Sequence, residues 1–169
     1  MTDEQKRIRS YLQAQGAKLS PAELVEKVQQ AMRDLRAAAL LVPPERFAQR
    51  PRPDDWSGNE VLAHVVAAGR YFGDAIVALA SGAPVAARPA GRGNEGAKPL
   101  PAEEWLEILE GDRAALFARA LTADPTAHLE GTVEHPFFGP LNWRETLLFM
   151  RLHDLDHAGQ LKQIAAALG

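Results

Sequence analysis

Apolar residues recur every three or four positions in three long stretches of the chain. This spacing places them on one face of a helix. The apolar positions are Leu24, Val28, Met32, Leu35 and Ala39 in the first stretch, Leu62, Val65, Phe72, Ile76 and Leu79 in the second, and Trp105, Leu109, Leu116 and Ala120 in the third. We predict a fourth helix over residues 143–168, where leucines flank a row of polar side chains.

Three of these helices carry a start signal in the sequence. In a capping box, a Ser, Thr or Asn side chain and a Glu three residues later satisfy two otherwise free N–H groups at the first turn. Pro43 and Pro44 end the first helix and Gly82 ends the second, because neither residue type favours continuation. The predicted boxes pair Ser20 with Glu23, Ser57 with Glu60, and Asn142 with Glu145.

The connections complete the predicted architecture. Residues 1–16 are predicted as a short polar arm or helix that ends at Gly16, and residues 81–100 are a Gly-, Pro- and Ala-rich loop without apolar periodicity. Only residues 129–133 (LEGTV), in the irregular stretch before the last helix, favour an extended conformation. We therefore predict one all-α domain over residues 1–169. It is a four-helix bundle with a long crossover between its second and third main helices.

The composition narrows the classes of function. Hydrophobic residues make up 46% of the chain and charged residues 24%, which is typical of a globular domain. The net charge of −3 argues against nucleic-acid binding. The apolar runs are too short for a membrane span and the first residues lack a secretory signal, so we expect a cytoplasmic protein. The chain has no cysteine, so any reactive thiol must come from another molecule.

Three histidines are candidate metal ligands. His153 and His157 stand four residues apart, which places both imidazoles on one face of the last helix. His64 lies among apolar residues of the second main helix. Three converging imidazoles that leave one position open are typical of a catalytic zinc, nickel or iron site. The alternative is that His153 and His157 are surface or capping histidines paired with Asp154 and Asp156.

Five further polar residues each have two interpretations. Glu60 is a candidate general base, one turn from His64, but it also completes a capping box. Asp156 and Gln160 are either partners of the histidines or ordinary helix-face and loop-binding residues. His128 and His135 precede the last helix, and a loop histidine bonded to the backbone is the simpler interpretation for both. His135 alternatively lies at the mouth of a pocket.

Two motifs resemble those of the DinB-like superfamily of metal-dependent proteins. They are WSGNEVLAHV, with its W-S-x-x-E-x-x-x-H pattern, and RLHDLDHAGQ, with H-D-x-x-H-x-x-Q. The resemblance covers residues 20–168 and implies an up-down-down-up bundle that is often a homodimer. It also implies a metal ion on His64, His153 and His157. Some relatives are transferases or isomerases that use a low-molecular-weight thiol such as mycothiol, bacillithiol or glutathione.

Three hypotheses of function follow. The first is a transferase in which the metal ion activates an external thiol for attack on a small electrophilic substrate. The second is a hydrolase that uses metal-bound water, with Glu60 as the base. The third is a non-enzymatic metal- or ligand-binding module, related to stress, in which the ion supports folding.

Overall fold

Helices form most of the structure. The computed structural model describes residues 1–169. Its five α-helices are α1 (Asp3–Lys18), α2 (Pro21–Leu41), α3 (Gly58–Ala80), α4 (Ala102–Thr122) and α5 (Trp143–Leu168). A short 3-10 turn, η1 (Pro44–Arg46), follows α2, and a two-stranded antiparallel hairpin, β1 (Val133–His135) and β2 (Gly139–Leu141), precedes α5. The predicted helical class is confirmed, with this small hairpin as an addition.

The predicted helix starts are all observed. Helices α2, α3 and α5 begin with the capping boxes expected at Ser20, Ser57 and Asn142, and α1 has a fourth box built from Thr2 and Gln5. Each box bonds two of the N–H groups that a helix leaves free at its start. Helix α4 begins after Pro101 with no side-chain cap.

Two local predictions were wrong. Helix α1 does not end at Gly16 but continues to Lys18, because Gly16 is buried where α1 meets the start of α5. A Cβ at Gly16 would lie 3.2 Å from Cγ of Glu145, so this glycine serves a close helix contact. The extended segment is also shorter and later than LEGTV, since only Val133 of that sequence belongs to a strand.

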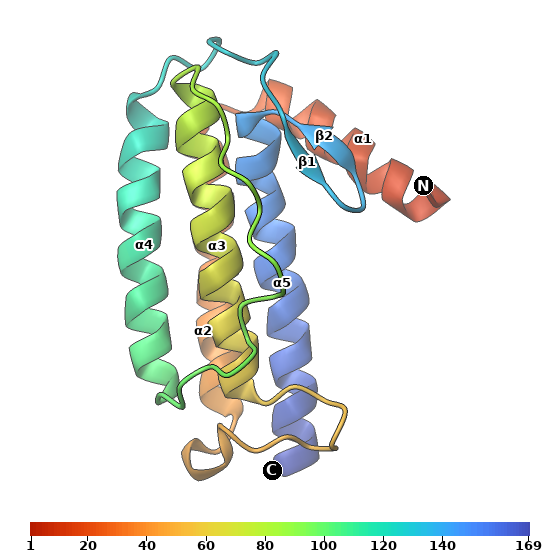
Figure 1. Cartoon of the computed structure of the whole chain (residues 1–169), viewed down its shortest axis with the longest axis vertical. Helices are drawn as coiled ribbons and strands as arrows, with labels where there is room; N and C mark the ends of the chain where they lie inside the picture. Colours follow the sequence, from red (N-terminus) through yellow and green to blue (C-terminus); the bar gives the residue numbers. More distant parts are fainter.

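Helices α2, α3, α4 and α5 lie alongside one another, and α1 and the hairpin lie at one end (Figure 1). Helix α5 contacts α1, α2 and α3, while α4 contacts α2 and α3. Helix α3 has the length and apolar composition of a membrane span, although we predicted from the sequence that no apolar run is long enough for one. Half of its most apolar window is buried in the protein, as in a core helix.

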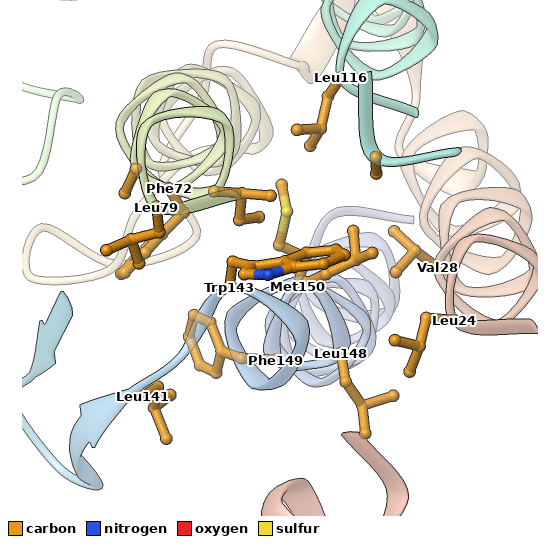
Figure 2. Close-up of a cluster of buried hydrophobic side chains, with 14 of the residues drawn as sticks. Leu24, Val28, Phe72, Leu79, Leu116, Leu141, Trp143, Leu148, Phe149 and Met150 are labelled. Carbon is orange, nitrogen blue, oxygen red and sulfur yellow. The ribbon is translucent and has the colours of Figure 1, made fainter. Parts of the chain in front are cut away.

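The core is built around α5. The indole of Trp143 is fully buried at its first turn, and apolar residues from three other helices and from β2 surround it (Figure 2). Indole Nε1 donates a hydrogen bond to the Ala127 carbonyl at 3.1 Å, so the one polar atom of this ring is satisfied. The labelled neighbours include Leu24 and Val28 of α2, Phe72 of α3, Leu116 of α4 and Leu141 of β2.

The crossover segment, residues 81–101, returns along α3 to the start of α4 (Figure 1). The guanidinium of Arg88 lies 5.6 Å from the centre of the Phe72 ring, and the Arg92 carbonyl bonds to His64. Farther on, the Lys98 carbonyl accepts a hydrogen bond from Asn59. The crossover predicted between the second and third main helices is therefore present. It follows α3 from its C-terminal toward its N-terminal end.

Candidate metal centre

The three candidate histidines converge between α3 and α5. His153 and His157 stand one turn apart on α5, and His64 faces them from α3. Nε2 of His153 lies 3.2 Å from Nε2 of His64 and 3.2 Å from Nε2 of His157. All three potential ligand atoms lie within 4.8 Å of one another, a spacing suited to a single divalent ion.

The partners of the other ring nitrogens favour one tautomer for His64 and for His157. Nδ1 of His64 lies 2.6 Å from the Arg92 carbonyl oxygen, and Nδ1 of His157 lies 2.8 Å from Oε1 of Gln160. Because both partners are acceptors, each Nδ1 carries the proton and each Nε2 keeps a free lone pair. The single Nε2 of His153 can donate to only one of them. The cluster therefore presents lone pairs to one point, which favours a bound cation.

The surroundings favour the neutral form of His64 and His153. Burial lowers the pKa of His64, and repulsion from His157 lowers it further. Burial also lowers the pKa of His153 well below its usual value, with added repulsion from His157 and His64. Only a neutral imidazole can coordinate a metal ion. The lowered pKa values of His64 and His153 therefore favour metal coordination at neutral pH.

The two aspartates between the histidines do not pair with them. Asp154 is fully buried and accepts two hydrogen bonds, of 2.8 and 2.9 Å, from Arg113 of α4. Asp156 is exposed. Gln160, and not Asp156, is the partner of Nδ1 of His157. The interpretation of His153 and His157 as surface histidines paired with these aspartates does not describe this structure.

A cavity of about 600 Å³ opens beside the histidines. Its wall includes His157 and Gln160 of α5, Arg92 of the crossover segment, and Trp56 with its neighbours before α3. The Trp56 ring lies 5.3 Å from the His64 ring and below the Arg92 guanidinium, at 5.8 Å. A small molecule in this cavity would reach the centre from the His157 side.

Glu60 is engaged elsewhere. Its carboxylate accepts hydrogen bonds of 2.8 and 2.7 Å from Arg50 and another from the backbone of Ser57. The Arg50 guanidinium is the main reason why the pKa of Glu60 is lowered. Glu60 therefore completes the capping box of α3, and its lowered pKa makes it a weak base.

The remaining two histidines lie outside the cluster of three. His135 is buried, and its Nδ1 accepts hydrogen bonds from the backbone N–H groups of Phe137 and Phe138 at 3.1 and 3.3 Å. Burial, with a smaller contribution from Arg88, lowers the pKa of His135 to about 4. His128 is exposed, with a left-handed backbone. The backbone-bonding interpretation therefore holds for His135.

The sequence did not reveal the partner of His64. This partner is a backbone carbonyl, and any residue type could supply it. The only local signal is the run of glycines around it, Gly91, Gly93 and Gly96, all of which have a positive φ.

Comparisons with known proteins bear on the same residues. The family model described as DinB superfamily matches residues 10–161, which include all three histidines. No curated protein and no solved structure matched the chain.

Proposed function

The chain belongs to the DinB superfamily, and from this premise we propose that it is a metal-dependent transferase for a low-molecular-weight thiol. His64, His153 and His157 would hold one divalent ion, such as zinc, nickel or iron. One observation carries the proposal: three Nε2 atoms face a common point, and oxygen acceptors hold the Nδ1 protons of two of the rings.

The donor set fits such an ion. Three neutral imidazoles leave at least one coordination position open, which distinguishes catalytic from structural zinc sites. When bound, the ion would lower the pKa of a coordinated thiol and so supply the reactive thiolate. Because the chain has no cysteine, the thiol would be a second substrate.

The protein's own residues would position the reactants. Arg92 and Gln160 hold the rings of His64 and His157, so the ligands need little reorganisation. The cavity beside His157 is large enough for a small thiol and its electrophile. Trp56 offers an apolar wall and Arg92 a positive charge within it.

The structure favours the thiol route over hydrolysis. A metal-bound water would benefit from a nearby base, and the one predicted base, Glu60, is bonded to Arg50 and to the helix cap. The cavity at His157 also favours an enzyme over a closed metal-binding module. In keeping with the family resemblance, we also propose a cytoplasmic homodimer. The course of the crossover segment supports up-down-down-up order for α2–α5 (Figure 1).

Metal content is the decisive first measurement. We would purify the protein without a polyhistidine tag, incubate it with zinc or nickel, and measure bound metal by elemental mass spectrometry. We expect one equivalent in the wild type and in His128→Ala, an exposed control, and none in His153→Ala. A wild type that retains no metal would refute the site. Turnover of model electrophiles that requires both metal and thiol would then identify the transferase.

A further inference from the structure

The crossover segment does more than connect α3 to α4. Its residues contact α3 in a regular, descending order. Arg88 lies over Phe72, Gly93 lies against Ala67, and Lys98 lies beside Asn59. At the middle of this path the Arg92 carbonyl accepts the Nδ1 proton of His64. We propose that the segment is a positioning element for the histidine centre and that Gly93 is the residue that seats it.

The segment is fixed on both sides of this contact. Before it, the Arg88 guanidinium stacks on Tyr71 and Phe72. After it, the buried Asn59 amide donates to the Lys98 carbonyl at 3.3 Å and accepts from the Leu100 N–H at 3.0 Å. Within it, the Glu95 carboxylate accepts the Arg92 N–H at 3.2 Å. The Arg92 carbonyl is therefore held against His64 by the segment's own contacts.

Gly93 permits the close approach. Its φ is +77°, in the left-handed region that favours glycine. A Cβ at this position would overlap the Cβ of Ala67. Ala67 lies three residues after His64, so the two share one face of α3. Any side chain at residue 93 would thus lift the segment away from the face on which His64 is held.

The chain contains a matched control. Gly96 belongs to the same segment and has a similar φ of +65°, but a Cβ there would have no neighbour within 4 Å. Gly93→Ala and Gly96→Ala therefore impose similar backbone strain, and only the first creates a clash with α3. A rescue is also available. The double variant Ala67→Gly/Gly93→Ala removes the Cβ at position 67 with which the new side chain would clash. The Cα at position 67 lies 3.8 Å from the new Cβ, which is an ordinary contact.

Two readouts test the proposal on the full chain. The first is zinc affinity by competition with a chromophoric chelator, and it rests on the metal site proposed above. Loss of a ligand's hydrogen-bond partner typically weakens metal binding about 10- to 100-fold. We expect such a loss for Gly93→Ala, none for Gly96→Ala, and recovery in the double variant. Circular dichroism would show that each variant remains folded.

The second readout needs no metal. Long-range ¹H–¹⁵N NMR spectra of the metal-free protein report the tautomer of His64, whose signals are identified by their absence in His64→Ala. We expect the Nδ1–H form in the wild type and Gly96→Ala, and a mixture of tautomers in Gly93→Ala. Equal tautomers and affinities in the two glycine variants would overturn the proposal. If the wild type binds no zinc, the metal site fails, and this NMR signature alone decides the role of the segment.

Discussion

Acidification should destabilise the protein through His135, a histidine outside the proposed metal centre. Its Nδ1 must be unprotonated to accept the N–H groups of Phe137 and Phe138. Burial lowers its pKa from 6.5 to about 4 in the folded state. Between these two values the unfolded chain binds a proton that the folded protein does not. The contribution of His135 is therefore complete above pH 6.5 and is lost as the pH falls to about 4.

The size of the effect follows from the shift. One pKa unit corresponds to about 1.4 kcal/mol, so the lowering of the pKa to about 4 corresponds to about 3 kcal/mol. This is a large share of the roughly 5 to 15 kcal/mol that stabilises a typical domain. Because His135 is only 5% exposed, solvent screening reduces the effect little.

The assay is urea unfolding, followed by circular dichroism, at several pH values between 4 and 7. The test variant is His135→Asn, which keeps a turn-forming acceptor before Pro136 but cannot titrate. The control is His128→Asn, since His128 is exposed and asparagine tolerates its left-handed backbone. We expect His135→Asn to lose about 3 kcal/mol less than the wild type and the control over this range. Equal losses in all three proteins would refute the assignment.

Two further predictions concern α5. Asp154→Ala should lower the free energy of unfolding by about 3 to 5 kcal/mol, because it leaves the Arg113 guanidinium buried without its partner. Arg113→Met/Asp154→Leu should recover most of this loss in the same urea titration, and a double variant no better than the single one would contradict the reasoning. Gln160→Leu should weaken zinc binding about tenfold in a chelator competition, because it removes the acceptor of the His157 proton. Lys162→Gln, at an exposed position of α5 outside the cavity wall, should leave zinc affinity unchanged, and equal affinities in both variants would exclude a role for Gln160.

The helices could be predicted because their signals are local. A capping box involves residues three positions apart, so the start of α3 can be read at Ser57 without knowledge of the fold. The end of α1 could not be read in the same way. Gly16 resembles a helix terminator in sequence, but a contact with Glu145, far along the chain, gives this residue its role. The hairpin was missed because strands of three residues are too short for a periodic pattern.

In the candidate site, too, the features set by local sequence could be predicted, and those set by tertiary packing could not. The spacing of His153 and His157 fixes their common face, because a helix makes neighbours of residues four apart. The convergence of His64 with them depends on how α3 packs against α5. The sequence allowed this convergence only as a hypothesis, and the family resemblance implied it. The bond from His64 to the Arg92 carbonyl lay beyond prediction, since it depends on the path of a segment without regular structure.

Buried polar contacts explain how α5 presents its histidines to α3. Hydrophobic packing is non-directional and would tolerate some rotation of α5 about its axis. A bidentate ion pair is directional, and Asp154 forms one with Arg113 of α4, from which it accepts two hydrogen bonds. At the first turn of α5, Arg144 donates to the carbonyls of Gly16, Leu19 and Pro125. These contacts hold α5 at two points along its length. With the rotation of α5 fixed in this way, His153 and His157 face His64.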